Sequence, residues 1–239
     1  MGIKKLTKFS RRLALLVASL FFTIVYPDET IGFFNSGIGK LKTYHLVWAY
    51  VCWRMIKPLF PRLNKGSQGG KCFSNNFEPI QQNLSKKNLL KKVIRQTDKA
   101  ELRVVAFWLV LLAIPGILYY GGIISELGIY NAFFVFLLLD RIAVLYWCPF
   151  RDWLVKNRCC NDCVVNKWGY LIVASSLIYI PSFWTYSVIF LAALNLIQWE
   201  WLRYKHPERF SPLFNKSLAC KGKDCATIEF CPKGIKPKK

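Results

Sequence analysis

Acidic residues are scarce in this sequence. Its 239 residues include 13 Asp and Glu but 34 Lys and Arg, which gives a formal net charge of +21. Histidine occurs twice, in neither case within a long apolar run, so a haem held by two histidines inside such a run is not expected. Walker A, G-x-S-x-G, H-E-x-x-H, C-x-x-C-H and dinucleotide-binding motifs are absent from the sequence as well. No recognisable catalytic motif is present, and an enzyme is therefore not the first expectation.

Charges of both signs are missing from two long stretches. Residues 104–125 form a run of 22, and residues 168–199 a run of 32, without Asp, Glu, Lys or Arg. About 20 consecutive apolar residues cross a bilayer as a helix. The chain is also 54% hydrophobic while carrying its large charge, a combination that is unusual for a soluble domain. Together these features predict an all-α integral membrane protein.

Two transmembrane helical hairpins are expected in the C-terminal half. The first covers 104–147 and turns at Ser125-Glu126. The second covers 168–202. One helix through its 32 charge-free residues would be about 48 Å long, against about 30 Å of hydrocarbon. Pro181-Ser182 is therefore expected to divide it into two legs, and a single tilted span is the alternative.

The N-terminal part, residues 1–61, contains shorter apolar stretches. Residues 13–26 follow a basic start and predict an uncleaved anchor or a re-entrant segment, since no small-x-small cleavage site of a secretory signal follows them. Residues 43–53 are rich in aromatic side chains and are flanked by Lys and Arg. That pattern predicts an interfacial helix or the second leg of a short hairpin.

Residues 62–103 connect this part to the first hairpin. Residues 62–83 are rich in Gly, Ser and Asn, which predicts a loop. Cys72 in this loop has no cysteine neighbour, and we expect it to be an unpaired surface thiol. Residues 85–103 predict a basic amphipathic helix that lies on an anionic lipid leaflet, with a helix packed on its own protein as the alternative.

Basic residues gather in three segments that two hairpins would place on one side of a membrane. Residues 54–103 contain 12 Lys and Arg, 148–167 contain four and 203–239 contain ten, whereas the turns at 125–126 and 181–185 contain none. Positively charged loops stay in the cytoplasm. We therefore expect the loop 148–167 and the tail 203–239 to be cytoplasmic, in the cytoplasmic or plasma membrane. The N-terminal part must then cross an even number of times, or not at all. The expected partners are anionic lipids and other membrane subunits, not nucleic acid.

Cysteines are concentrated in the loop and the tail. Cys160-Asn-Asp-Cys163 has the spacing that lets two sulfurs bind one ion. A second half-site is expected from Cys220 and Cys225 or from Cys148 and Cys159. Four thiolates suit zinc or an iron–sulfur cluster, and the nearby Lys and Arg residues favour the thiolate form. Structural thiols are one alternative, and disulfides or a redox switch are another, the disulfides requiring the opposite topology.

Charged residues also occur within the predicted hairpins, where they are costly and often functional. Asp140 and Arg141 lie in the second leg of the first hairpin. Neighbours in sequence point in different directions on a helix, so we do not expect them to pair with each other. Arg203, or Arg141 from a packed neighbour, is an expected partner for Asp140, and Glu200 for Arg141.

Three functions are consistent with these patterns. The first is a membrane protein whose cytoplasmic cysteines bind zinc or an iron–sulfur cluster for redox transfer or metal handling. The second is a small transporter or channel that uses Asp140. The third is a non-catalytic scaffold subunit of a larger complex, which the short loops and the missing catalytic motifs favour.

Overall fold

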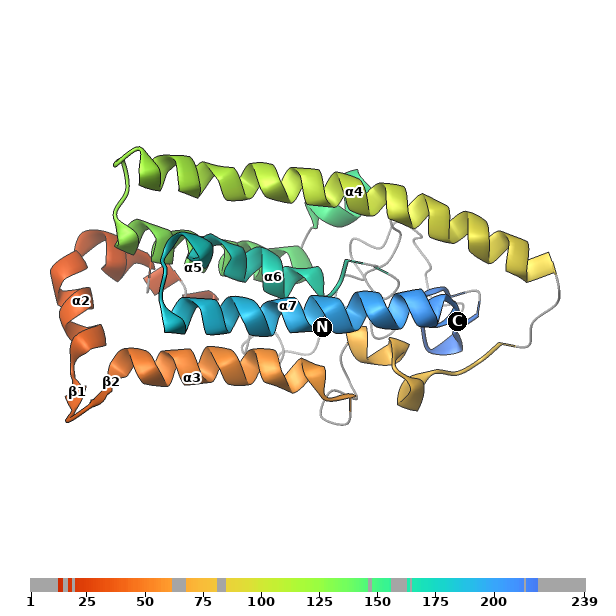
Figure 1. The fold of residues 1–239 in the computed structure, drawn as a ribbon, viewed down its shortest axis with the longest axis horizontal. Helices are drawn as coiled ribbons and strands as arrows, with labels where there is room; N and C mark the ends of the chain where they lie inside the picture. The colour runs from red at the N-terminus through yellow and green to blue at the C-terminus, as the bar shows by residue number, and fades with distance from the viewer. Residues whose placement is uncertain are drawn as a thin grey trace, which may run out of the picture.

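A computed structural model shows a helical bundle (Figure 1), in agreement with the all-α prediction. It describes residues 13–14, 17–18, 20–61, 68–80, 85–145, 148–155, 163, 165–212 and 214–218. The main helices are α2 (Pro27–Asn35), α3 (Thr43–Ile56), α4 (Ser85–Tyr120), α5 (Glu126–Leu145), α6 (Trp168–Ala174) and α7 (Phe183–Lys205). Two short strands, β1 (Gly37–Ile38) and β2 (Leu41–Lys42), pair antiparallel.

Short helical turns connect and extend these helices. They are the 3₁₀ helices η1 (Lys57–Leu59), η3 (Gln68–Cys72), η4 (Ser74–Asn76), η7 (Ser175–Tyr179), η8 (Pro207–Phe210) and η9 (Lys216–Leu218), and one turn of π-helix, η5 (Phe150–Val155). Residues 20–25 are also helical and lead into α2.

The first predicted hairpin is formed by α4 and α5. The chain turns at 121–125, where Gly122 has a φ of 73° that a glycine adopts without strain. α5 then begins at Glu126, close to the expected position. α4 has 36 residues and contains Pro115. It runs without interruption across the boundary that we expected at 103–104, so the predicted amphipathic helix and the first apolar run are one element.

The second predicted hairpin is divided where Pro181-Ser182 indicated. α6 and η7 end at Tyr179, and α7 begins at Phe183. The Ser182 hydroxyl caps α7 by accepting a hydrogen bond from the Thr185 backbone N–H at 3.2 Å. The two legs differ in length, since Trp168–Tyr179 spans 12 residues and α7 spans 23. The first leg is also the more buried, because Ala174, Ser176 and Leu177 are each at most 5% exposed.

Hydrogen bonds between helices establish how the legs pair. Trp48 of α3 donates to Ser187 Oγ of α7. From α7, Asn195 donates to Met55 O and Gln198 donates to Leu59 O. All three bonds are 2.8 Å long, and the residues of each pair are 139 or 140 positions apart. A constant separation means that α3 and α7 run parallel. The predicted segment 43–53 is thus part of a helix, α3, that packs along α7. The bond from Asn195 confirms the interhelical role that its position within an apolar run predicts.

α4 pairs with the leg formed by α6 and η7 in the same way. The Trp108 indole N–H donates to Ser175 Oγ at 3.0 Å, and the Tyr179 hydroxyl donates to Leu112 O at 2.8 Å, both across 67 positions. Gly116 lies close to this contact, and a Cβ there would come within 2.5 Å of the Tyr179 ring. These helices are therefore also parallel and closely packed.

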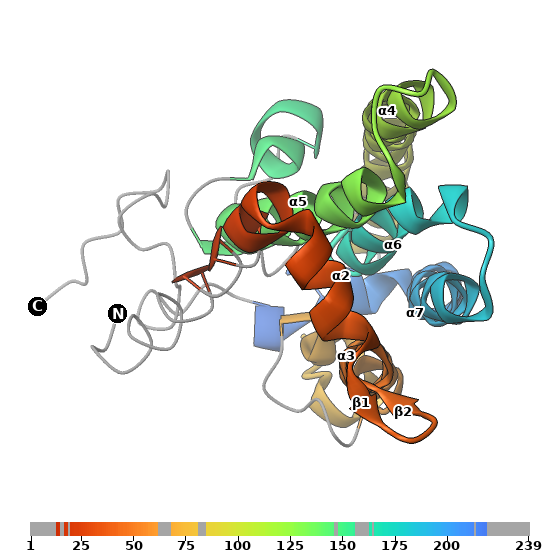
Figure 2. The same cartoon turned by 90° about the vertical axis from the view of Figure 1, so that its left-hand side faces the viewer.

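The two ends of the bundle differ. At one end, α2, β1 and β2 lie across the bundle, beside the turns that join α4 to α5 and η7 to α7 (Figures 1 and 2). At the other end, α3, α5 and α7 finish and α6 begins (Figure 1). We call this second end the basic end, because Arg54, Arg141, Lys167, Arg203 and Lys205 lie there.

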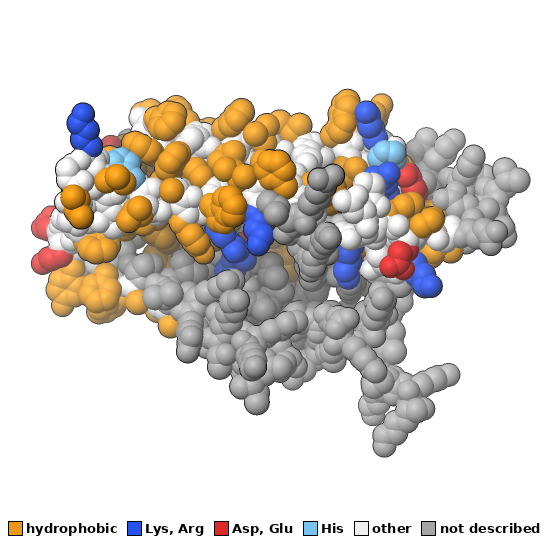
Figure 3. Space-filling model, turned by 90° about the horizontal axis from the view of Figure 1, so that it is seen from below, with side chains coloured by type: hydrophobic (Ala, Val, Ile, Leu, Met, Phe, Trp, Pro, Cys, Tyr) orange, Lys and Arg blue, Asp and Glu red, His pale blue; other side chains and the backbone are white. Residues whose placement is uncertain are grey.

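The outer surface of the bundle is apolar. On α7, Phe183, Phe190, Ile197 and Trp201 are 59–71% exposed, whereas Asn195 on the opposite face is 2% exposed. Figure 3 shows hydrophobic side chains gathered along the length of the described face. Within the described chain, one helical stretch, Asp98–Tyr120, is long and apolar enough to cross a membrane, and 17% of its apolar window is buried in the bundle.

Candidate functional site

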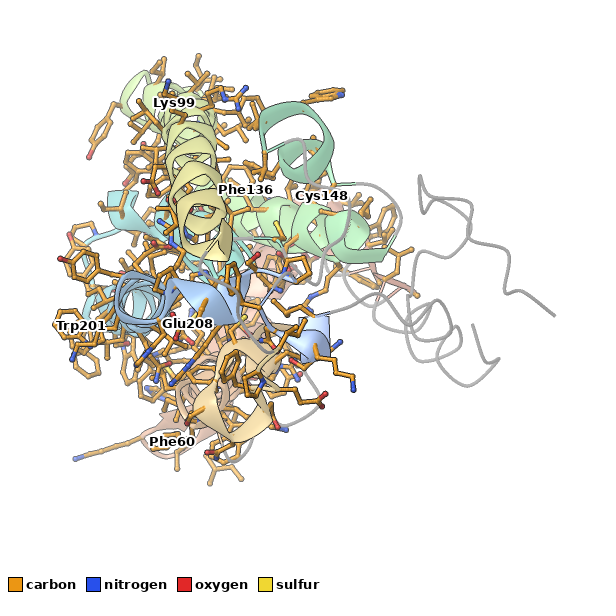
Figure 4. All side chains as sticks on the ribbon, turned by 90° about the vertical axis from the view of Figure 1, so that its right-hand side faces the viewer. Phe60, Lys99, Phe136, Cys148, Trp201 and Glu208 are labelled. Atoms are coloured by element: carbon orange, nitrogen blue, oxygen red, sulfur yellow. The ribbon has the colours of Figure 1, made fainter. Side chains whose placement is uncertain are left out.

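A cluster of apolar side chains at the basic end brings several distant segments together. Its buried members are Cys72, Val104, Val165, Trp168, Trp199, Phe210 and Leu218, and Phe150, Leu154, Val155 and Cys163 pack against them. We call these eleven residues the basic-end cluster. Figure 4 shows this end, with Cys148 beside the end of α5 and Lys99 on α4. The cluster therefore joins the 68–80 loop, the 148–167 loop and the segment after α7.

Cys72 is one of the most buried side chains in this cluster. It is 2% exposed, so the prediction of a surface thiol was wrong. The loop that carries it is tied to the segment after α7, because Lys71 O accepts from Asn215 Nδ2 at 3.2 Å and from Ser217 Oγ at 3.3 Å. The backbone of Lys216 also donates to Glu78 O at 2.8 Å. These long-range bonds hold the loop against the bundle and turn Cys72 inward.

Two of the predicted metal ligands are described at this end. Cys163 is half-buried and packs against the cluster that contains Cys72. Cys148 is half-buried and begins the segment that continues into η5, where Phe150 meets Phe107 of α4 with ring centroids 5.6 Å apart. Cys160, Cys220 and Cys225 lie outside the described residues. In the sequence, Cys160 is three positions before Cys163, and Cys220 is two positions after Leu218 of the cluster.

No complete metal site is formed by the described side chains alone. Among them, no three His, Cys, Asp or Glu residues are grouped closely enough to hold a metal ion. Cys72 and Cys163 are the two described thiols that belong to the basic-end cluster. Sulfur donors in a water-poor setting suit a soft or borderline ion such as zinc, or an iron–sulfur cluster. The described donor set therefore fits part of a thiolate site.

Lys167 lies beside Cys72 and is 5% exposed. Burial lowers the pKa of Lys167 to about 8, and the charge of the Cys72 thiolate acts in the opposite direction. Burial also raises the pKa of the Cys72 thiol to about 12, against the effects of Lys71 and Lys167. The Lys167 ammonium is 5.5 Å from the centre of the Tyr170 ring. In the part of the chain that the structure describes, no carboxylate pairs with it.

Arg203 is the second cation at the basic end, and its environment is different. Glu101 of α4 binds its guanidinium with both oxygens, and Glu200 and Asp98 add contacts of 3.1 and 3.5 Å. The Trp168 indole N–H donates to Glu200 at 2.8 Å. We call Arg203, Glu101, Glu200, Asp98 and Trp168 the Arg203 network; it connects α4, α6 and α7.

The Arg203 network overturns two expectations from the sequence. Glu200 pairs with Arg203 and not with Arg141, and Arg203 is not the partner of Asp140. Glu101 was missed because it lies in a basic stretch that looks like a solvated helix face. The sequence does contain one indication that Glu101 is buried. Val104 and Val105 follow it by three and four residues, which places Glu101 on the same helix face as these apolar side chains.

Asp140 and Arg141 do form a pair, contrary to expectation. Arg141 Nε lies 3.7 Å from Asp140 Oδ2, because long side chains can curl back even when neighbouring Cα–Cβ bonds diverge. Asp140 also packs against the start of α6, where a Cβ on Gly169 would come within 2.7 Å of its Oδ1. Both residues, with Arg54, lie close enough to act electrostatically on Tyr170. The pair therefore lies at the contact between α5 and α6.

Known proteins add nothing to this description. Comparison of the chain with protein-family models, with curated proteins and with solved structures finds no match.

Proposed function

We propose that this chain is an integral membrane protein whose basic end faces the cytoplasm and holds a thiolate centre. The centre would bind zinc or an iron–sulfur cluster and serve redox transfer or metal handling. One observation carries the proposal: three chain segments that carry or lead to cysteines pack around the basic-end cluster. Those segments contain Cys72, Cys148 and Cys163, and Leu218 just before Cys220.

Membrane insertion is supported by the apolar side chains on the outer surface and by the polar side chains buried between the helices. Large apolar residues face outward along α4 and α7, whereas Asn195, Ser176 and Thr185 are at most 3% exposed. Lipid tails are as apolar as a protein core, so membrane bundles associate through close packing and interhelical hydrogen bonds. The bonds between α3 and α7 and between α4 and η7 are of this kind. Helices α5 and α7, with 20 and 23 residues, are about 30 and 35 Å long, enough to cross the hydrocarbon.

The short leg formed by α6 and η7 also fits this proposal. Its 12 residues would leave polar backbone ends exposed to lipid if it stood at the edge of the bundle. The leg is instead buried among its neighbours. Non-helical backbone at membrane depth is tolerated where protein covers it, so the buried part of this short leg is compatible with insertion.

The orientation is supported by the position of the charges. Arg54, Lys167, Arg203 and Lys205 lie at the basic end, on α3, before α6 and on α7. Positively charged segments are retained in the cytoplasm. The reducing cytoplasm keeps clustered thiols available as ligands. If the basic end faces the cytoplasm, its cysteines therefore stay reduced and can bind a metal.

The metal is tested on protein purified without oxygen in detergent, by elemental analysis together with an absorbance spectrum. We expect about one zinc ion, or the iron and visible absorption of an iron–sulfur cluster, per chain. Changing Cys160→Ser together with Cys163→Ser should remove it. Cys52→Ser is the matched control, since Cys52 is a buried thiol of a different cluster. Folded, metal-free wild-type protein would refute the proposal.

The orientation is tested separately with a membrane-impermeant thiol reagent on intact cells. Ile38 is 91% exposed in β1, at the end opposite the basic end. Cells that contain Ile38→Cys should be labelled, and cells with the wild-type chain should not. Labelling of wild-type Cys160 or Cys163 from outside would show that the thiols face an oxidising compartment, where disulfides replace the metal.

A further inference from the structure

Helix α3 and its extension η1 have an outward face that changes from apolar to basic along the chain. The core-facing side carries Cys52 and Met55, which are at most 7% exposed. The exposed residues of the opposite side are, in chain order, Leu46, Tyr50, Trp53, Arg54 and Lys57. Arg54 and Lys57 are three positions apart, so they lie on the same face within reach of one anion. α3 runs along the edge of the bundle (Figures 1 and 2), which leaves this face on the outside.

The parallel packing of α3 along α7 fixes the depth of these two cations. The hydrogen bonds between the helices join residues 139 or 140 positions apart, so Arg54 lies level with 193–194 of α7 and Lys57 with 196–197. Glu200 is the first charged residue of α7. At about 1.5 Å per residue, Arg54 lies about 9 Å and Lys57 about 5 Å nearer the middle of the bundle than Glu200. Figure 3 likewise shows Lys and Arg side chains about midway along the described face.

Outward cations at this depth are surrounded by apolar surface. Within the described part of the chain, no carboxylate forms an ion pair with Arg54 or Lys57. Ile197, level with Lys57 on α7, is apolar and 62% exposed. In a bilayer, a charged side chain among acyl chains is costly unless it reaches a headgroup. Tyr50 and Trp53, which precede the cations on this face, are residue types that favour the headgroup region.

We propose that Arg54 and Lys57 bind the phosphate of an anionic phospholipid of the cytoplasmic leaflet, whose acyl chains pack against Trp53 and Tyr50. The guanidinium of Arg54 can donate two parallel hydrogen bonds to a phosphate, and Lys57 adds a second charge. This inference rests on the proposed membrane insertion and orientation and gives the basic end a lipid partner. A headgroup bound at this depth lies closer to the bilayer centre than the headgroups beside α7, so the leaflet is thinned next to α3.

Native mass spectrometry of the full-length protein tests the lipid site. The protein is released from detergent micelles that contain phosphatidylglycerol or phosphatidylcholine, and the bound lipid is measured as a function of its concentration. Wild-type protein should bind phosphatidylglycerol more tightly than phosphatidylcholine. One basic residue near an anionic surface changes binding by about fivefold, so Arg54→Gln with Lys57→Gln should bind phosphatidylglycerol about 25-fold more weakly. Binding of phosphatidylcholine should not change.

The matched control is Lys205→Gln with Lys216→Gln. It also removes two exposed positive charges at the basic end but leaves the outward face of α3 intact, so it should keep the wild-type affinity for phosphatidylglycerol. Arg54→Lys with Lys57→Arg retains both charges and should keep most of the affinity. The thermal unfolding midpoint shows that each variant is folded.

The outcomes separate this inference from the proposed function. Wild-type protein that alkaline carbonate removes from isolated membranes is not inserted, and this overturns both. Inserted protein that binds the two lipids equally well overturns the lipid site alone. The lipid site is also overturned if the folded Gln variant of Arg54 and Lys57 keeps the wild-type affinity, or if the control loses as much affinity as that variant.

Discussion

Arg203 and Lys167 are two cations buried at the same end of one helical bundle, and the protein treats them differently. Arg203 lies among three carboxylates from α4 and α7. Lys167 lies beside Cys72 and Tyr170, with no described carboxylate. Both cations are largely buried, and among the described residues only Arg203 pairs with carboxylates.

This difference indicates two kinds of role. A cation whose partners all come from the protein fixes helix packing, and the Arg203 network connects α4, α6 and α7 in this way. A buried cation that lacks such partners is a candidate for a functional site, since proteins seldom retain an uncompensated charge without a use for it. The comparison therefore predicts opposite stability effects when each cation is replaced by an apolar side chain.

The largest effect is expected for Arg203→Met. The change leaves the Glu101 carboxylate buried without its guanidinium, and breaking a buried pair in this way costs about 3–5 kcal/mol. Thermal unfolding in detergent micelles measures the loss. Adding Glu101→Leu to Arg203→Met should recover much of it, because the second change removes the orphaned charge. If Arg203→Met alone lost only a little stability, the Arg203 network would not be what holds α4, α6 and α7 together.

Lys167→Met should have the opposite sign in metal-free protein. Removing an uncompensated buried charge while keeping the side-chain volume is expected to stabilise the protein by about 1–2 kcal/mol. The same unfolding assay, performed with a metal chelator, measures the gain. Destabilisation by Lys167→Met would show that the ammonium already has an adequate partner, and the contrast with Arg203 would disappear.

A neutral polar contact in the interior of the bundle should matter less than either charge. Asn195→Leu removes the hydrogen bond to Met55 O, and interhelical bonds of this kind contribute about 1 kcal/mol. We expect a loss of that size in the unfolding assay. Ile197→Leu is the control, because Ile197 is 62% exposed on the outer face and should leave stability unchanged.

The smallest effect is expected for an exposed cation at the same end. Lys205 lies 4.6 Å from the centre of the Trp201 ring, and an exposed cation–π contact contributes about 0.5 kcal/mol. Lys205→Met should therefore change the unfolding midpoint only slightly. A loss as large as that of Arg203→Met would show that stability depends on the total positive charge of this end, not on which cations are buried.

Much of the helical layout could be predicted from the sequence. The start of the second charge-free run at Trp168, the turn before Glu126 and the division at Pro181-Ser182 correspond to observed boundaries, whereas the start of the first run lies inside α4. These features are local, because an apolar run favours a helix and a proline interrupts it whatever the rest of the chain does. The packing of segment 43–53 could not be predicted in this way, since a helical pattern does not say which helix α3 packs along.

The polar contacts were predicted less well. The pairing of Glu200 with Arg203 is local, since the two residues are three positions apart on α7. The recruitment of Glu101 and the burial of Cys72 depend on residues far apart in sequence. Glu101 and Arg203 are 102 positions apart, and the bond that ties the Cys72 loop to the tail joins residues 144 positions apart. Spacing within one segment carries no information about such meetings.

The sequence by itself determined which stretches become helices, where they break and on which segments the positive charge is placed. Only the tertiary structure decided which polar side chains meet inside the bundle. The physical reason is that successive side chains of a helix are rotated by about 100° around its axis, so they point to all sides. Which of these sides becomes buried depends on the neighbour against which the helix packs. The pairing of Arg203 and the isolation of Lys167 are set at that level.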